Sequence, residues 1–300
     1  MELAAVVVIF NPLSIGVEKI KSNMLTYTPF CKKVYIVDNS DQEYSHCFGD
    51  IKDACYVSNK NKGGIAGAHN LGCLKALEDG FDWVVTMDQD SCFEDKQFGH
   101  YVELVENYQS NDDCAVSFSP RIVNLTESKN WLHLLRKNIF GLLKRKIFKR
   151  FSCGLQEIEF PTEVIASGNI ISLKAWNLAG RFDEQLFIEQ VDYDFSHVLI
   201  EKGFKIVRFN QVLLDQVFGK RVFSLLKKNY PWYDDKRMYY VFRNIFIEMK
   251  RFPEYKRKYK RILRLRFFDY CVNTVHPISH FLNFMKSYRD FKKLVSMRGF

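Results

Sequence analysis

The chain begins with an uninterrupted apolar run, Leu3–Phe10, which stops at Asn11-Pro12. Apolar, β-branched runs of this length are typical of strands that are covered on both faces, as in a parallel sheet. This is the longest apolar run in the chain, and it is far shorter than the roughly 18 residues that a membrane-spanning helix needs. Glu2 precedes it and no basic leader accompanies it, which argues against a secretory signal.

Strand and helix patterns alternate after this first strand. Further strands are expected at 33–38, 54–58 and 81–87, and helices at 14–27 and 65–77. This alternation predicts βαβ units and an α/β fold with a mostly parallel central sheet, wound like a nucleotide-binding domain. A second α/β stretch is expected from residue 163 to about residue 214.

Composition and charge exclude several other classes of protein. Hydrophobic residues form 47% of the 300 residues and aromatic residues 15%, so a disordered or fibrous protein is ruled out. The eight cysteines are scattered without a CxxC pair, so we expect free thiols in a reducing cytoplasm and no zinc site. Residues 220–300 carry a net charge of +15 and residues 1–219 a net charge of −6, which predicts chemistry in the first part and contact with an anionic surface by the second.

Four polar residues lie at or just beyond the carboxyl ends of the expected strands: Asn11, Asp38, Asn61 and Asp88. In open α/β sheets the ligand crevice lies outside these ends, so their convergence on one edge predicts a binding site. Each residue taken alone fits an ordinary turn or helix cap, because Asn and Asp are common there.

Asp88-Gln89-Asp90 follows the strand at 81–87 directly. Two carboxylates at a strand end can bind a hard divalent cation, Mg²⁺ or Mn²⁺, whose shell is completed by substrate phosphate. An isolated pair of this kind is more often a solvated loop, and its place at the end of a buried strand is what favours a metal site.

The segment 61–70 (NKGGIAGAHN) is rich in glycine but has neither the Walker pattern nor GxGxxG. Its glycines allow close backbone approach and begin a helix whose first amides could face a phosphate. Close packing of the helix on the sheet is the alternative, with Gly67 as the candidate.

Asp192 is the candidate for a general base. If a helix begins near Val191, this carboxylate lies in the first turn, where the helix dipole alone would favour it. The functional interpretation is that it lies at the mouth of the crevice and takes a proton from an attacking hydroxyl.

Several ordered motifs resemble the inverting family 2 glycosyltransferases of the GT-A fold, especially the bacterial rhamnosyltransferase-like branch. The matching stretches are VVVIFNP at 6–12, VDNS at 37–40, NKGGIAGAHNLG at 61–72, FDWVVTMDQDS at 81–91, IASGNIISLKAWNLAGRFDEQLFIEQVDYDF at 165–195, GFKI at 203–206 and YYVFRN at 239–244. The resemblance implies a GT-A (Rossmann-like nucleotide-diphospho-sugar transferase) domain at 1–219, made of a nucleotide-sugar half at 1–120 and an acceptor half at 121–219. A basic insertion at 124–160 interrupts the acceptor half, and a basic, mainly helical segment follows at 220–300.

The resemblance also implies roles for individual residues. Asp192 is the expected catalytic base, and Asp90 and Asp88 are the expected ligands of Mg²⁺ or Mn²⁺. Substrate and nucleotide binding is expected from Asn11, Pro12, Asp38, Asn61, Gly63, Asn70, Asp88, Gln89, Ser167, Gly168, Asp194, Arg243 and Asn244. Of these, Arg243 and Asn244 are expected near the diphosphate or the acceptor.

One position departs from the family pattern. The family commonly has a histidine in a late LxHxxG-like motif and assigns it to the metal, whereas this chain has Gln216. Glutamine is a poorer ligand than histidine for a transition metal but is acceptable for Mg²⁺. Asp215 is the alternative third ligand.

The implied reaction is a single displacement at the anomeric carbon of a nucleotide-sugar. Rhamnose from dTDP-rhamnose is the first expectation, and galactose or glucose from a UDP-sugar are the alternatives. The expected acceptor is a growing cell-surface polysaccharide, O-antigen or capsule precursor on polyprenyl diphosphate, which places the protein in the cytoplasm or peripherally on the inner membrane. Basic segments at 131–150 and 251–268 fit interfacial helices there, and they fit ordinary packed helices with a solvated basic face equally well.

Two functions of other classes remain as alternatives. A nucleotidyltransferase would also use a crevice, a metal and paired carboxylates, but the arginine-rich loop expected near the first strand is absent. A nucleic-acid-binding protein would use the basic and aromatic C-terminal segment, but no RNP, helix-turn-helix or zinc-finger pattern supports it.

Overall fold

The structure is a computed structural model of the 300-residue chain. It describes residues 1–94, 96–124, 156–216, 221–222, 230–231, 233–272, 274 and 276–298. Most of the predicted basic insertion at 124–160, including the basic segment at 131–150, lies outside the described residues.

The first half of the central sheet consists of parallel strands in the order β3-β2-β1-β4. Their bounds are Leu3–Ile9 for β1, Lys33–Asp38 for β2, Ala54–Ser58 for β3 and Trp83–Asp88 for β4. Helix α1 (Val17–Met24) lies between β1 and β2 in the chain, and α2 (Gly64–Glu78) between β3 and β4. The predicted alternation of strand and helix is confirmed in this half.

The second half of the sheet is mixed. Strand β8 (Asn169–Ser172) runs antiparallel between β4 and β6 (Ala115–Asn124), and β6 pairs in parallel with β9 (Lys205–Gln216). The short strands β5 (Cys92–Phe93) and β7 (Ile158–Glu159) pair antiparallel with β9. The expected parallel direction therefore holds for the first four strands, whereas β8, β5 and β7 add antiparallel pairs.

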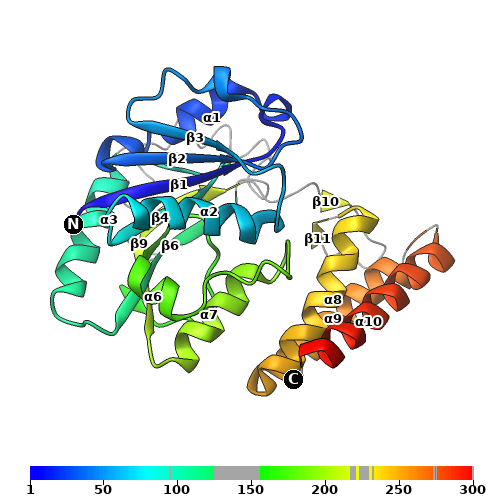
Figure 1. Ribbon diagram of the computed structural model, residues 1–300. Helices are drawn as coiled ribbons and strands as arrows, with labels where there is room; N and C mark the ends of the chain where they lie inside the picture. Colours follow the sequence, from blue (N-terminus) through cyan, green and yellow to red (C-terminus); the bar gives the residue numbers. More distant parts are fainter. Residues whose placement is uncertain are drawn as a thin grey trace, which may run out of the picture.

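Helices cover both faces of this sheet (Figure 1). The later helices of the sheet domain are α3 (Gln97–Gln109), α6 (Leu173–Leu178) and α7 (Val191–Glu201). Successive residues of β1 point to opposite faces, so that Val6 packs with α2, α6 and α7, whereas Val7 packs with α1 and α3. Because both faces are buried, β1 is apolar throughout and does not alternate.

The C-terminal segment forms a helical layer beside the sheet domain (Figure 1). Its helices are α8 (Asp235–Arg251), α9 (Lys256–Phe267) and α10 (Pro277–Arg298), with the π-helix η7 (Phe268–Val272) between α9 and α10. Helices α9 and α10 both contact α8 and enclose a separate apolar core that includes Phe242 and Tyr259. The predicted basic helical extension is confirmed.

The remaining elements are short. They are the 3₁₀ turns η1 (Pro12–Ser14), η2 (Thr28–Phe30), η3 (Ser45–Cys47) and η6 (Pro253–Tyr255), and the paired strands β10 (Arg221–Val222) and β11 (Tyr230–Pro231). The cysteines in the described part of the chain form no disulfide bond. Among the described helices, none combines the length and the apolar character needed to cross a membrane.

Candidate active site

The carboxyl ends of β2, β1 and β4 bring the predicted polar residues to one edge of the sheet. In the strand register Asp38 lies opposite Ile9, and Asp88 lies opposite Val8, so the two carboxylates flank β1. Their strands are two spacings apart, about 10 Å. This edge is therefore lined on both sides of β1 by acidic residues.

Asp38 fixes the loops at this edge. Its carboxylate accepts hydrogen bonds from the Ser40 amide, at 2.8 Å, and from the Tyr56 hydroxyl. Ser40 Oγ in turn accepts a hydrogen bond from the Asn11 amide at 2.8 Å. Asn11 has a left-handed φ of 46° and an exposed side chain, whereas Pro12 is buried at the start of η1. Asn11 therefore presents its side-chain amide to solvent, while Asp38 holds the Asn11 backbone in place through Ser40.

The acid cluster is formed by Asp88 and Asp90 at the end of β4 and by Asp192 in the first turn of α7. Burial, followed by repulsion from Asp90 and Asp192, raises the pKa of Asp88 to about 8, so the carboxylates lie close enough to interact. Burial also raises the pKa of Asp90. The predicted metal-binding pair and the predicted base thus share one site.

The surroundings of Asp192 raise the pKa of its carboxyl group. Burial raises its pKa to about 6, Glu189 adds to the increase, and a hydrogen bond from the Ala166 amide opposes it. The carboxylate is therefore ionised at neutral pH and is more basic than an ordinary aspartate, whose pKa is about 3.9.

Gln216 completes the acid cluster on the side of β9. Its Nε2 donates a hydrogen bond to Asp88 Oδ2 at 2.9 Å, and its Oε1 is buried without a hydrogen-bond partner among the described residues. Asp215 precedes it in the same strand and so points to the opposite face of the sheet. Of the two predicted alternatives for a third metal contact, Gln216 is the one beside Asp88.

The backbone around the end of β4 is held by three of the predicted residues, Gln89, Ser167 and Gly168. Gln89 exchanges two hydrogen bonds with the Phe10 backbone, at 3.0 and 2.9 Å, so its amide is occupied by the chain. Buried Ser167 accepts a hydrogen bond from the Asp88 amide at 3.2 Å. Gly168 has a φ of 78° and donates its amide to the β4 backbone at 2.8 Å. We predicted ligand contacts for these three residues. In the structure Ser167 binds the Asp88 amide, whereas Gly168 and Gln89 bind the backbone of β4 and of the residue after β1.

The glycine-rich segment brings α2 against a loop of the chain itself. Gly63 and Gly64 have positive φ of 64° and 62°, and a Cβ on Gly64 would lie 2.1 Å from the Phe187 carbonyl oxygen. The Ile65 amide, in the first turn of α2, donates a hydrogen bond to this oxygen at 2.8 Å. The prediction that the first amides of α2 face a phosphate is therefore wrong at Ile65, which a protein carbonyl occupies.

The other residues of this segment shape the turn into α2. Asn61 is half-buried and has a φ of 56°. A Cβ on Gly67 would lie 2.1 Å from the Lys62 carbonyl oxygen, whereas one on Gly72 would lie 2.3 Å from the Val6 side chain in β1. Close packing of helix on sheet is thus provided by Gly72, and Gly67 serves the turn.

The loop that leads to Asp192 has an uncommon backbone. Phe187, Glu189 and Gln190 have positive φ of 65°, 64° and 63°. For residues other than glycine this region costs of order 1–3 kcal/mol each, and it persists only where the surroundings over-determine it. The loop, residues 185–190, must therefore be held from outside.

Arg243 and Asn244 on α8 hold the 185–190 loop. Asn244 is fully buried, and its Nδ2 donates at 2.8–2.9 Å to the carbonyl oxygens of Leu186, Ile188 and Glu189. Arg243 Nη2 donates to the carbonyl oxygens of Gln185 at 2.5 Å and Leu186 at 3.1 Å. The expectation that this pair contacts the diphosphate or the acceptor is not supported, because these donors bind the backbone.

Arg237 is a site residue that we did not predict from the sequence. It opposes the increase in the pKa of both Asp88 and Asp90, so its charge reaches the acid cluster. Its Nε lies 2.6 Å from Glu189 Oε1, which ties it to the loop that carries Asp192. The sequence did contain one indication of where Arg237 lies. Asp234 caps α8 by accepting a hydrogen bond from the Arg237 amide at 2.7 Å, and a capping aspartate, which places Arg237 in the first turn of a helix, can be recognised in a sequence.

Asp194 faces away from the acid cluster, because two residues along a helix turn the side chain by about 200°. It forms a buried ion pair with Arg251 on α8, and burial and then Glu248 raise the pKa of Asp194 well above its usual value. Its predicted contact with substrate is replaced by this pair.

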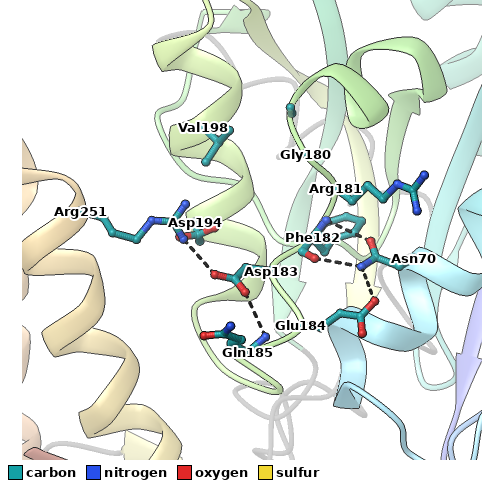
Figure 2. A pocket seen from close by; sticks show the side chains of 11 residues that line it. Asn70, Gly180, Arg181, Phe182, Asp183, Glu184, Gln185, Asp194, Val198 and Arg251 are labelled. Atoms are coloured by element: carbon teal, nitrogen blue, oxygen red, sulfur yellow. Dashed lines mark hydrogen bonds and ion pairs between the residues drawn. The ribbon is translucent and has the colours of Figure 1, made fainter. Parts of the chain in front are cut away.

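A pocket of about 440 Å³ lies on this side of α7 (Figure 2). Asn70 lies at its wall and binds the segment after α6, with hydrogen bonds to the Phe182 backbone at 3.0 and 2.9 Å and to Glu184 at 2.9 Å. Asp194 and Arg251 also line the pocket, whereas no member of the acid cluster does. Asn70 thus binds the chain itself, at a place separate from the cluster.

Comparison with known proteins indicates the class of this chain. Residues 16–162 match the model of the family described as Glycosyl transferase family 2, and this match supports a nucleotide-sugar glycosyltransferase. The match ends before Asp192, so the motif and the geometry of the site carry the argument for that residue.

A second similarity is to a relative of known activity. The dTDP-rhamnosyl transferase RfbF of Shigella flexneri is 22% identical over 249 residues, which make up 82% of this chain and 79% of the relative. A solved structure, of GalNAc-T7 with UDP, GalNAc and Mn²⁺, has a similar fold with a TM-score of 0.51 and 11% identity. The similarity covers 73% of this chain and 44% of that chain. The predicted GT-A α/β fold is confirmed.

Proposed function

We propose that this glycosyltransferase is an inverting rhamnosyltransferase that uses dTDP-rhamnose, with Asp192 as its base. The observation that carries the proposed chemistry is the interaction of the Asp88 carboxylate with both Asp90 and Asp192. The choice of rhamnose and of dTDP is supported by similarity to the Shigella flexneri relative.

In the proposed reaction Asp192 deprotonates the acceptor hydroxyl while the oxygen of that hydroxyl attacks the anomeric carbon. Attack comes from the face opposite the nucleotide, so the configuration inverts. A pKa of about 6 leaves Asp192 ionised at neutral pH and makes it a better proton acceptor than an ordinary aspartate. A positioned base typically contributes about 10²–10⁴-fold to the rate.

Negative charge grows on the nucleoside diphosphate as its bond to the sugar breaks. We assign Arg237 to this charge in place of Arg243, because Arg237 acts on Asp88 and Asp90 whereas Arg243 is bound to the loop backbone. A preorganised cation at the developing charge is a large source of rate acceleration.

A divalent cation, Mg²⁺ or Mn²⁺, fits at Asp88 and Asp90. Gln216 Oε1 beside them is a buried oxygen that lacks a partner among the described residues, and carboxylate and amide oxygens suit such cations. Within the described ranges no three His, Cys, Asp or Glu side chains are grouped to hold a metal. The proposed cation would take two carboxylates from the protein and phosphate oxygens from the donor. When bound, the cation neutralises charge on the departing diphosphate.

The nucleoside is assigned to the edge formed by Asn11, Asp38 and Asn61. The Asn11 side chain is exposed there, and Asp38 fixes its backbone through Ser40. We also propose that the acceptor is a glycan on a polyprenyl diphosphate, which would bring the enzyme to the cytoplasmic face of a membrane.

The test is a panel of nucleotide-sugars, assayed for transfer and for donor hydrolysis with chelator, with Mg²⁺ and with Mn²⁺. We expect dTDP-rhamnose to be the preferred donor, and activity to disappear with chelator and return with either cation. Asp192→Asn should keep the donor KM and lose about 10²–10⁴-fold in kcat, whereas Asp113→Asn, at an exposed site, should not change either. Preference for UDP-galactose or UDP-glucose would overturn the choice of sugar, and an active Asp192→Asn enzyme would overturn the choice of base.

A further inference from the structure

Helix α9 exposes a stripe of basic side chains along one face. Arg257, Lys260, Arg261 and Arg264 are all exposed, and their spacing of three to four residues places them on the same side of the helix. None of these four forms an ion pair within the described part of the chain, and α9 contains no acidic residue. We call these four residues the basic stripe.

Helix α10 exposes a stripe of apolar side chains in its first half. Ile278, Phe281, Leu282 and Met285 are 77%, 46%, 62% and 44% exposed, at the spacing i, i+3, i+4, i+7 of a single helical face. A helix of a soluble protein normally packs such an apolar face against the core. In α10, however, other residues, such as Phe284, pack against the core of the C-terminal helices. We call the four exposed residues the apolar stripe.

The two stripes meet at η7. Phe268, 42% exposed, lies four residues beyond Arg264 and so continues the basic stripe by one turn. The preceding Phe267 contacts Phe281, with ring centroids 6.4 Å apart. The end of the basic stripe therefore adjoins the start of the apolar stripe at η7.

We propose that the basic stripe and the apolar stripe form a docking surface for an anionic lipid bilayer. Cations beside exposed large apolar side chains are the pattern of an interfacial surface, in which Lys and Arg meet lipid phosphates and the apolar groups enter the acyl boundary. A nucleic acid would use the cations but not four apolar side chains, and a second copy of this chain, with the same positive stripe, would be repelled. The purpose of docking rests on the proposed lipid-linked acceptor, whereas the binding itself does not depend on an acceptor.

The experiment is flotation of the full chain with vesicles of phosphatidylcholine alone or with phosphatidylglycerol added. We expect binding only to the anionic vesicles, and weaker binding in high salt because the charges are then screened. Removing three basic residues, in R257A/R261A/R264A, should lower partitioning about 100-fold, since each contributes roughly five-fold near an anionic surface. The matched control K19A/K174A/K202A, which removes three exposed lysines from α1, α6 and the end of α7, should bind like the wild type.

The apolar stripe has its own pair of variants. I278S/L282S should lower partitioning even at low salt, whereas L25S/L178S, at residues 68% and 57% exposed elsewhere, should not. The proposal would be overturned if the chain bound neutral and anionic vesicles equally, or if the control variants lost as much partitioning as the stripe variants. Tight binding of a single-stranded oligonucleotide with no binding to vesicles would also overturn it. Donor hydrolysis in solution should be unchanged in all four variants, so a failure of docking and a failure of the proposed reaction are separate results.

Discussion

Asn244→Asp tests whether α8 positions Asp192, the proposed catalytic base. The substitution keeps the shape of the side chain and the oxygen that accepts from Arg243 Nε at 2.9 Å. It removes the Nδ2 donor from the carbonyl oxygens of Leu186, Ile188 and Glu189. The 185–190 loop then loses its main support while its left-handed residues remain strained.

The expected loss of stability follows from the number of hydrogen atoms on Asn244 Nδ2. Nδ2 carries two, so at most two full hydrogen bonds are lost, and each contributes about 0.5–1.5 kcal/mol net. The free energy of unfolding should therefore fall by about 1–3 kcal/mol, with a further increment if the carbonyls stay buried and unpaired. Relaxation of the loop displaces Asp192, and a displacement of about 1 Å can cost roughly 10²-fold in rate.

The assay combines urea unfolding with kcat and donor KM. We expect kcat to fall by about 10–100-fold with little change in the donor KM, because the loop carries the base and not the nucleotide edge. The control is Asn283→Asp on α10, whose Nδ2 donates to the Asp235 carbonyl oxygen and to the Tyr270 hydroxyl, at 2.7 and 2.8 Å. It should lose stability alone. If Asn244→Asp unfolds more readily yet keeps the wild-type kcat, the positioning role is refuted.

Three further predictions follow from the same contacts. Arg251→Met should lower the free energy of unfolding by about 3–5 kcal/mol, because it leaves the buried Asp194 carboxylate without its cation, and a thermal melt will show this. Gly64→Ala should destabilise the fold and lower kcat, since its Cβ would meet the Phe187 carbonyl oxygen, whereas Gly49→Ala, in open space, should do neither in paired melts and assays. The pH profile of kcat/KM should fall about ten-fold per unit below pH 6 and level off above it, because Asp192 must be ionised and burial raises its pKa to about 6; a profile flat to pH 4.5 would contradict this.

The fold was readable because burial leaves a pattern in the sequence. Strand β1 is covered on both faces and is therefore apolar throughout, and glycines and aspartates mark where strands and helices begin and end. The antiparallel β8 was not readable in this way. Its direction depends on pairing with β4 and β6, which are distant in sequence, and a four-residue strand carries no signal of direction.

The candidate site was readable only in part. Asp88, Asp90 and Asp192 were predicted from carboxylates at a strand end and at a helix start, and in the structure Asp88 interacts with both of the others. Asn70 and Asn244 were expected to bind a ligand, yet both bind backbone groups of loops far away in the chain. An amide can satisfy a substrate or an orphaned backbone group equally well, and the sequence does not tell which group will lie nearby.

Helix α8 connects the proposed catalytic site with the proposed docking surface. Helix α8 holds the 185–190 loop through Asn244 and contacts α7 itself through Glu248, whose Oε2 lies 3.0 Å from His197 Nδ1. The same helix packs against α9 and α10, which carry the basic stripe and the apolar stripe. Because the supported loop has strained residues that need an external hold, the rigidity of α8 sets the position of Asp192. The proposed membrane surface and the proposed base are thus attached to one helix, so that the proposed docking would fix how the acid cluster is oriented toward the proposed lipid-linked acceptor.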